Sequence, residues 1–316
     1  MKEMSEDSYY RSSIYRSNEI LDWCPSDASG KFEKNCKKYR NNESLKYYKE
    51  NPIEYSFNNY GFRTPDDFND KDEGNVFLGD SNTFGIGHHL ENTWSYKLNK
   101  ELDGKFWNLS QGGSGIQAAY RLLGGFKDMI KIKNIYHLAL HHPRFEFIYE
   151  GGVIKLSPFT IDLLVRTDKI KFDKPTVIEY FQGGDKKSIK VHSFKEFYVN
   201  ILANKEYIDF IHNGYIYALK GLANEIGCNY YYLTGFDIFE GYETRGSKIW
   251  GFGPKSDPHP SYRGRHPDDN SLEARDLIHF STGQQHFIYE EFKKLIKGDT
   301  KWLKEKHLNN HKQKFK

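Results

Sequence analysis

Apolar runs of strand length alternate with stretches of helical spacing along the middle of the chain. The strand-like runs lie at 76–78, 106–109, 134–142 and 228–234. Apolar residues recur at helical spacing at 91–102, 116–130 and 193–226, and again from Phe287 to Leu295. Because strands that alternate with helices usually pair in parallel through right-handed crossovers, this order predicts an α/β fold with a parallel sheet.

Three regions interrupt this order and divide the chain. Residues 1–50 are polar and rich in lysine and tyrosine, which predicts an N-terminal arm packed on the main domain. Residues 145–192 combine short β-rich segments with Gly-Gly and Pro, which indicates an insertion after the third strand that overhangs the ligand crevice. We expect an α/β domain over 51–297 and a basic tail over 298–316. The tail is typical of a solvated helix end, and the alternative is attraction to an anionic surface.

Composition and charge narrow the class of protein. Of the 316 residues 37% are hydrophobic, and the 16% that are aromatic supply large side chains for a core. The net charge of +3 gives no reason to expect nucleic acid as a partner. Cys24, Cys36 and Cys228 form no C-x-x-C pair, which indicates neither a disulfide framework nor a cysteine zinc site. We see no signal peptide and no transmembrane segment, and therefore expect a cytoplasmic protein.

The first candidate for a chemical group lies at the end of the first strand. Gly79 stops the apolar run, Asp80 and Ser81 follow, and Gly85 and Gly87 complete a tight turn. An open α/β sheet has its ligand crevice at the carboxyl ends of its strands, so the Ser81 hydroxyl can meet a substrate there as a nucleophile. Serine is also a common cap of a helix, and this segment alone does not choose between the two roles.

A glycine-rich turn, Ser110 to Gly115, follows the second strand and opens the next helix. Backbone N–H groups at such a turn, together with the positive end of the helix, suit an oxyanion or a phosphate. Neither a Walker loop nor a G-x-G-x-x-G spacing is present, so a nucleotide site is not indicated. A plain tight turn explains the glycines equally well.

Three histidines, His137, His141 and His142, lie on or beside the third strand. Histidines at this spacing can share a metal ion. No acidic residue stands beside them, so the pattern favours histidines that are packed or hydrogen-bonded at the sheet edge. We therefore expect no metal at these histidines.

An imidazole and a carboxylate stand close together near the end of the chain. A serine hydroxyl becomes a good nucleophile when an imidazole takes its proton, and a carboxylate that holds the other ring N–H assists. Asp276 and His279, three residues apart and just ahead of the last helix, can supply both groups. His259 and His266, in the long loop over 235–275, are rival sources of the imidazole, but neither has this spacing or directly precedes a helix.

Together these segments resemble the SGNH hydrolases, the GDSL lipase and esterase family. The family's G-D-S-x-T-x-G-x-G block is similar to 79–87, and its second block, an Asn followed five residues on by a glycine, is similar to 108–113. The last block, D-x-x-H, is similar to 276–279. The segment 59–63 resembles leaders that precede the first block in many bacterial and phage members.

The resemblance implies a flavodoxin-like three-layer sandwich with a parallel sheet and a Ser-His-Asp triad. Ser81 would attack an ester carbonyl, His279 would shuttle the proton, and Asp276 would orient His279. The backbone N–H groups of Ser81 and Gly113 would hold the oxyanion, and Asp80 would brace the turn. Water completes deacylation, so no cofactor is implied.

The third block departs from the family pattern. Family members usually carry G-x-N-D after the third strand, and its Asn donates a side-chain N–H to the oxyanion. Pro143 stands in that place here and cannot donate, which leaves His142 or Arg144 as the replacement. Where neither replaces it, the loss of one donor typically lowers turnover by about 10²–10³.

The sequence therefore predicts a serine esterase that acts on an O-acyl ester of a small molecule or a glycan. The aromatic residues of the insertion and the long loop can stack on sugars, which favours a carbohydrate O-acetyl ester. One alternative is a non-catalytic binding or structural protein that keeps the fold, which the missing Asn favours. Another is an O-acyltransferase that uses the same residues. The oligomeric state is not readable from the sequence.

Overall fold

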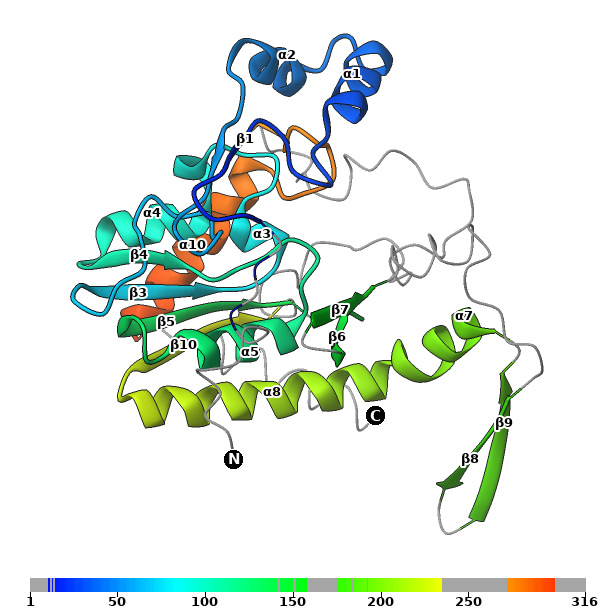
Figure 1. Ribbon diagram of the computed structural model, residues 1–316. Coiled ribbons are helices and arrows are strands. Elements are labelled where there is room, and N and C mark those ends of the chain that lie inside the picture. The colour runs from blue at the N-terminus through cyan, green and yellow to red at the C-terminus, as the bar shows by residue number, and fades with distance from the viewer. Residues whose placement is uncertain are drawn as a thin grey trace.

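The computed structural model describes residues 11, 13, 15–140, 143–149, 152–157, 176–182, 185–191, 193–234 and 272–298 (Figure 1). Some of the predictions above fall outside these residues. They concern His141 and His142, the tail beyond residue 298, and most of the loop that contains His259 and His266. Within the described residues, no helix combines the length and the apolar character needed to cross a bilayer.

The centre of the fold is a four-stranded sheet in which every pair of neighbouring strands is parallel. Its strands, in spatial order, are β10 (Asn229–Thr234), β5 (Lys131–Ala139), β3 (Glu73–Leu78) and β4 (Lys105–Asn108). The prediction of a parallel sheet is confirmed. The first of these strands in the chain, β3, lies between the second and the third. In doubly wound sheets, ligands bind at the carboxyl end of such a switch point.

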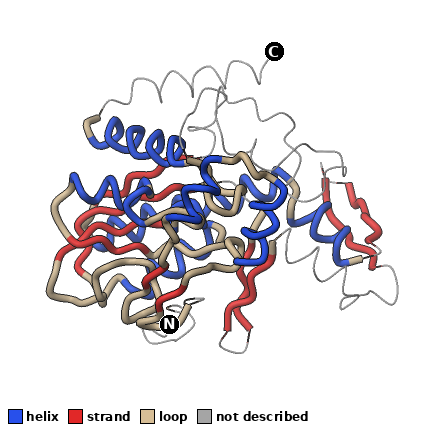
Figure 2. The backbone as a smooth tube through the Cα atoms, turned by 90° about the horizontal axis from the view of Figure 1, so that it is seen from above, coloured by secondary structure: helices blue, strands red, loops and turns tan. Residues whose placement is uncertain are grey.

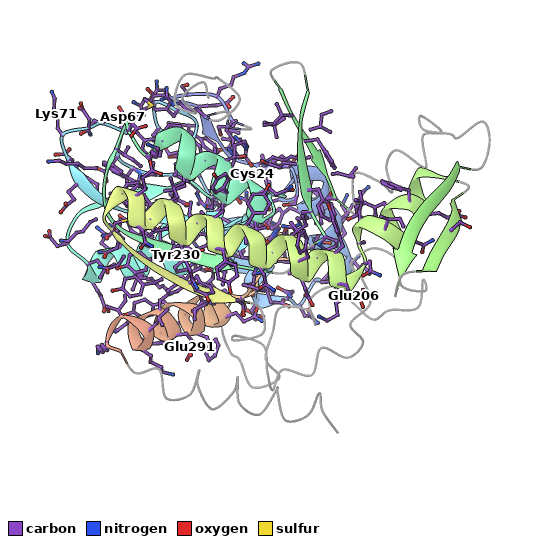
Figure 3. All side chains as sticks on the ribbon, turned by 90° about the horizontal axis from the view of Figure 1, so that it is seen from below. Cys24, Asp67, Lys71, Glu206, Tyr230 and Glu291 are labelled. Atoms are coloured by element: carbon purple, nitrogen blue, oxygen red, sulfur yellow. The ribbon has the colours of Figure 1, made fainter. Side chains whose placement is uncertain are left out.

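Helices cover both faces of the sheet, which gives three layers. One face carries α5 (Ile116–Phe126) and α8 (Lys205–Ile226), and the other carries α4 (Trp94–Glu101) and α10 (Thr282–Ile296). Seen from above, the strands run between helical segments (Figure 2). Seen from below, α8, which begins near Glu206, and α10, which carries Glu291, lie on opposite sides of β10 (Figure 3).

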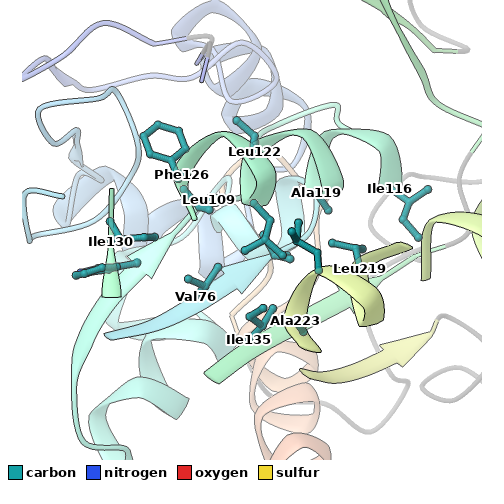
Figure 4. Close-up of a cluster of buried hydrophobic side chains, with 14 of the residues drawn as sticks. Val76, Leu109, Ile116, Ala119, Leu122, Phe126, Ile130, Ile135, Leu219 and Ala223 are labelled. Atoms are coloured by element: carbon teal, nitrogen blue, oxygen red, sulfur yellow. The ribbon is translucent and has the colours of Figure 1, made fainter. Parts of the chain in front are cut away.

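Both faces of the strands are apolar because both are covered. Along β3, Val76 and Leu78 pack toward α5 and α8, whereas Phe77 packs toward α4 and α10. The cluster on the α5 and α8 side includes Leu122 and Leu219 (Figure 4). This burial on both faces explains why the strand reads as a continuous apolar run and not as an alternating pattern.

The bounds of several predicted elements were wrong. β3 begins at Glu73, three residues before the predicted run at 76–78, and α8 covers only Lys205–Ile226 of the helical stretch predicted over 193–226. β5 begins at Lys131 and ends at Ala139, where the apolar run predicted 134–142. Its first residues pair with β3 through the backbone, but the lysines on either side of Ile132 are polar, and Lys133 reaches outward to Asp103 at 3.1 Å, so Ile132 alone gives too weak an apolar signal. Helix α5 ends at Phe126, four residues earlier than predicted.

Part of the predicted insertion forms two antiparallel hairpins that do not join the central sheet (Figure 1). They are β6 (Phe145–Tyr149) with β7 (Gly152–Leu156), and β8 (Thr176–Gln182) with β9 (Asp185–Val191). The short helix α7 (Phe194–Phe197) and the π-helix η2 (Tyr198–Leu202) then lead into α8. The β6–β7 hairpin is fixed to α5, because Glu146 accepts hydrogen bonds from the Arg121 guanidinium at 2.8 and 3.2 Å.

The N-terminal segment packs against the turn that follows β3. Its elements are β1 (Ile20–Leu21), α1 (Ser29–Lys38), α2 (Glu43–Glu50) and β2 (Tyr55–Ser56), and β1 pairs with β2. Tyr48, Tyr55 and Phe57 form one buried cluster with Phe84 and Ile86 of the turn. The segment therefore supports the region that contains Ser81.

We predict that Leu219→Ala lowers the free energy of unfolding by about 2–5 kcal/mol, because Leu219 is fully buried between α8 and the sheet. Tyr217→Ala is the control on the same helix, since Tyr217 is 73% exposed, and we expect a change within about 0.5 kcal/mol. Urea unfolding followed by circular dichroism measures both variants. Equal losses would contradict the placement of α8.

Candidate active site

Ser81 lies where β3 runs into the short helix α3 (Ser81–Phe84), at the carboxyl edge of the sheet. The N-cap of this helix is Asp80, whose Oδ1 accepts hydrogen bonds from Asn82 N at 2.9 Å and Asn82 Nδ2 at 3.2 Å. The alternative in which Ser81 caps the helix is therefore wrong. As the first residue of α3, Ser81 has a backbone N–H without an acceptor in the helix.

Two glycines of the first block are required by close approach. Gly79 has a φ of +150°, and a Cβ there would lie 2.1 Å from Thr83 Oγ1. Gly87 has a φ of +80°, and a Cβ there would lie 2.9 Å from the Cβ of Ala274 and 3.0 Å from Arg275 N. Gly87 therefore lets the segment that contains Asp276 pack directly on the segment that contains Ser81.

Asp276 and His279 form a hydrogen-bonded pair. His279 Nδ1 lies 2.7 Å from Asp276 Oδ2, and Asp276 Oδ1 accepts from the backbone N–H groups of Ile278 and His279. Burial by itself raises the pKa of Asp276, but the charge and the hydrogen bond of His279 outweigh it and hold the pKa below its ordinary value. The carboxylate is therefore ionised at neutral pH and orients the imidazole.

Phe280, the residue after His279, is hydrogen-bonded to both ends of the turn that begins at Ser81, at Asn82 and at His88. The backbone N–H of Phe280 donates to Asn82 Oδ1 at 3.3 Å, and the Phe280 carbonyl accepts from His88 Nε2. Gln285 of α10 adds a hydrogen bond from Nε2 to the Asn82 carbonyl at 3.0 Å. These contacts join segments that lie about 200 residues apart in the chain, and they bring His279 beside the segment that contains Ser81.

The hydroxyl of Ser81 and the imidazole of His279 are not hydrogen-bonded to each other. Within the described residues, Ser81 Oγ and His279 Nε2 have no hydrogen-bond partner. Ser81 is 3% exposed, and the side chain of His279 is 10% exposed. Catalytic hydrogen bonds are often long or poorly aligned before substrate binds, so this arrangement is compatible with a resting site.

His88 is the buried histidine that fixes this arrangement. Burial lowers its pKa to about 4, so the ring is neutral at neutral pH. Because the Phe280 carbonyl can only accept, we assign the proton to Nε2, which leaves Nδ1 to accept from the Tyr48 hydroxyl at 3.3 Å. His88 thus connects the N-terminal segment with the loop that carries His279.

The glycine-rich turn lies against the first block. Ser114 Oγ is within hydrogen-bond distance of the carbonyl oxygens of Gln111 at 2.6 Å and Gly79 at 3.2 Å. Gly113 is exposed and has a φ of +72°. Its backbone N–H donates no hydrogen bond to the described part of the chain. The turn therefore presents an unpaired N–H at the edge where Ser81 lies.

Arg144 is the residue of the divergent third block that the structure places at this edge. Its Nη1 lies 2.9 Å from Asp80 Oδ2 and donates to the Ser114 carbonyl at 3.3 Å, so it bridges the first two blocks. Its Nε and Nη2 have no partner among the described residues. Pro143 accepts a hydrogen bond from Tyr198 through its carbonyl. His142, the other candidate replacement, lies outside the described residues.

Two buried arginines tie the site to the N-terminal segment. Arg63 donates from Nη1 to the Gly85 carbonyl at 2.7 Å and from Nη2 to the His88 carbonyl at 2.8 Å. Its burial lowers the pKa of the guanidinium. Arg275, the neighbour of Asp276, forms an ion pair with Asp27 at 2.7 Å, and both side chains are fully buried. Buried charged groups therefore fix both the backbone that follows Ser81 and the residue before Asp276.

The third-strand histidines give no metal site in the described residues. His137 is buried, its Nδ1 lies 2.7 Å from the Tyr230 hydroxyl, and burial lowers its pKa to about 3. Within the described part of the chain, no group of three or more His, Cys, Asp or Glu side chains is arranged to hold a metal ion. His137 thus lies in the core as a hydrogen-bonded histidine.

The sequence did not reveal the residues that align the site. Asn82 lies inside the first block with no predicted role, and no sequence pattern marks His88, Asp27 or Arg275. Their partners lie 192 to 248 residues away in the chain, and such contacts leave no periodic pattern in a single sequence.

Comparisons of the chain with models of protein families, with curated proteins and with solved structures find no match. The functional conclusion therefore depends on the geometry of the Ser81 edge.

We predict that Asp276 makes stability depend on pH in the acid range. Because its folded pKa lies below the value of 3.8 expected for the unfolded chain, its stabilisation is complete above 3.8 and is lost as the pH falls through the folded pKa. Urea midpoints measured between pH 6 and pH 2.5 should therefore fall more steeply for the wild type than for Asp276→Asn. Parallel curves would contradict an ionised, hydrogen-bonded Asp276.

Proposed function

We propose that this protein is a serine ester hydrolase of the SGNH type with a flavodoxin-like fold. The observation that carries the proposal is the attachment of the Asp276–His279 pair to the Ser81 turn through Phe280. The strand order supports the fold assignment, because numbering the four strands along the chain gives the spatial order 2-1-3-4 of flavodoxin-like sheets.

The proposed reaction begins with attack of Ser81 Oγ on the ester carbonyl. His279 Nε2 takes the hydroxyl proton, and Asp276 stabilises the imidazolium through Nδ1–H. When the tetrahedral intermediate collapses, the proton passes from His279 to the departing alcohol and an acyl-serine remains. Water then attacks the acyl group with His279 as the base, which releases the acid and restores Ser81.

The proposed oxyanion hole consists of the backbone N–H groups of Ser81 and Gly113. Both are unpaired within the described residues and lie at the carboxyl edge of the sheet. Arg144 is the proposed substitute for the missing Asn. Its guanidinium is bonded to Asp80, the residue before Ser81, and retains N–H groups that can face a developing negative charge.

The strongest rival is a non-catalytic binding protein with the same fold. It is favoured by the absent hydrogen bond between Ser81 and His279, and by the proline in the third block. Acyl transfer to a hydroxyl acceptor would use the same residues as hydrolysis. Product analysis with and without a polyol distinguishes acyl transfer from hydrolysis.

We predict that Ser81→Ala and His279→Ala each lower the rate of p-nitrophenyl acetate hydrolysis by about 10³-fold or more, because each removes a member of the triad. Ser56→Ala and His286→Ala are the controls, since both side chains are exposed and lie outside the site. Initial rates at 405 nm measure all four variants. If Ser81→Ala and His279→Ala kept the wild-type rate, the protein would not be a serine esterase.

We predict that Asn82→Ala lowers kcat by about 10–100-fold with a smaller change in KM. The variant releases the Phe280 N–H, and a misplacement of about 1 Å at a catalytic group can reduce the rate about 10²-fold. Asn213→Ala, on the exposed side of α8, is the matched control and should leave kcat unchanged. Urea midpoints of both variants separate misalignment from unfolding. An unchanged kcat in folded Asn82→Ala would show that Phe280 does not align His279.

A further inference from the structure

Charged side chains gather where the β6–β7 hairpin meets the glycine-rich turn. The group contains three cations and two carboxylates: Arg121, Arg144, Lys155, Asp80 and Glu146. Arg121 comes from α5, Lys155 and Glu146 come from the hairpin, and Arg144 directly precedes the hairpin. All five side chains are largely or wholly shielded from solvent, with Lys155 the most exposed at 21%.

The carboxylates of this group are engaged by the arginines. Glu146 accepts from Arg121 Nε at 2.8 Å and Nη2 at 3.2 Å, and Asp80 is paired with Arg144 at 2.9 Å. Lys155 Nζ lies 3.8 Å from Glu146, beyond hydrogen-bond distance. Lys155 therefore forms only a long ion pair with Glu146, and it shares that carboxylate with Arg121.

The Lys155 ammonium has a neutral hydrogen-bond partner instead. Its Nζ donates to Gln111 Oε1 at 2.8 Å. The pKa of Lys155 is lowered to about 8, chiefly by burial; the charge of Glu146 opposes this shift, and the charges of Arg121 and Arg144 add to it. A bound anion would stabilise the charged form of Lys155 in these buried surroundings. The hydrogen bond to Gln111 alone does not require that charge, because a neutral amine can also donate it.

The position of this charge relates it to the proposed reaction. Gln111 belongs to the same turn as Gly113, and Arg144 is bonded to Asp80, the residue before Ser81. Arg144 also retains the Nε and Nη2 groups that have no partner among the described residues. An anion that contacts Lys155 therefore lies on the same edge of the sheet as the ester that Ser81 attacks.

We propose that Lys155 binds an anionic group carried by the substrate itself, so that the natural ester is an acidic O-acyl compound, while Arg144 faces the oxyanion. This inference rests on the proposed esterase function and adds the charge of the substrate to it. The anionic group is a carboxylate or a phosphate, since both accept hydrogen bonds from ammonium and guanidinium groups.

The test compares esters that differ in charge next to the same acetyl group. We would measure kcat/KM for 3- and 4-acetoxybenzoate, for their neutral methyl esters, and for 4-acetoxyphenyl phosphate. The wild type should prefer the anionic members, and the better of the carboxylate and phosphate arms identifies the group. Lys155→Met should lower the ratio of anionic to neutral kcat/KM by about 10-fold, the scale of one hydrogen bond to a charged group.

The control removes a lysine from the opposite end of the sheet. Lys131 is exposed at the start of β5, so Lys131→Met should leave the ratio unchanged. If Lys155 only braces the glycine-rich turn, Lys155→Met will slow neutral and anionic esters equally, and that outcome overturns the proposal. A wild type without preference for any anionic ester also overturns it.

The pH dependence gives a second readout. The groups that face the ammonium are Gln111, Arg121, Arg144 and Glu146. Lys155 loses its charge as the pH rises through about 8, so the anionic-to-neutral ratio of the wild type should fall between pH 7 and pH 9. The ratio of Lys155→Met should stay flat over this range. A wild-type ratio that does not change would contradict the role of Lys155.

Binding to Ser81→Ala separates this inference from the esterase function. Calorimetry with 3- and 4-acetoxybenzoate and their methyl esters measures affinity without turnover. Preferential binding of the anion, lost in Ser81→Ala/Lys155→Met, together with no hydrolysis by the wild type, would refute the esterase and retain the anion site. Hydrolysis by the wild type without charge preference in either assay would retain the esterase and refute the anion site.

Discussion

The peptide of Phe280 is held on both sides by the turn that carries Ser81, and the candidate active site depends on this constraint. The sheet alone brings the ends of β3, β4 and β5 together, but it does not place a loop from the end of the chain beside them. The side-chain oxygen of Asn82 accepts a hydrogen bond from the Phe280 N–H, and His88 Nε2 donates one to the Phe280 carbonyl. Each hydrogen bond contributes only about 1 kcal/mol net, so the alignment of His279 needs further support.

That support comes from the N-terminal segment. The Asp27 carboxylate accepts hydrogen bonds from the buried Arg275 guanidinium and from the Tyr55 hydroxyl. The same hydroxyl accepts a hydrogen bond from the backbone N–H of Gly87 at 2.8 Å. One carboxylate thus fixes both the residue before Asp276 and the glycine on which the last block packs. Removal of one partner from such a buried pair leaves an unpaired charge, which typically destabilises a protein by about 3–5 kcal/mol. The N-terminal segment is therefore part of the framework that holds the candidate active site.

The sequence predicted those features that depend on local pattern. The apolar run and Gly79 marked β3 and its turn, and a carboxylate three residues before an imidazole marked Asp276 and His279. Pattern failed where polar side chains outnumber apolar ones in a paired strand, as at the start of β5. It also failed for contacts between distant segments, such as that of Asn82 with Phe280, because either residue alone has many ordinary roles. The position of Lys155 beside Gln111 could not be predicted from the sequence, because it depends on how the β6–β7 hairpin packs against the glycine-rich turn.

The central claim is that Ser81 is activated by an imidazole from the far end of the chain. The most direct measurement is labelling with a fluorophosphonate, which reacts with activated serines, followed by intact and peptide mass spectrometry. We expect one adduct on the wild type, located at Ser81, and no adduct at comparable times on His279→Ala. A wild type that stays unlabelled, or a label at Ser81 that forms equally fast without His279, would contradict it.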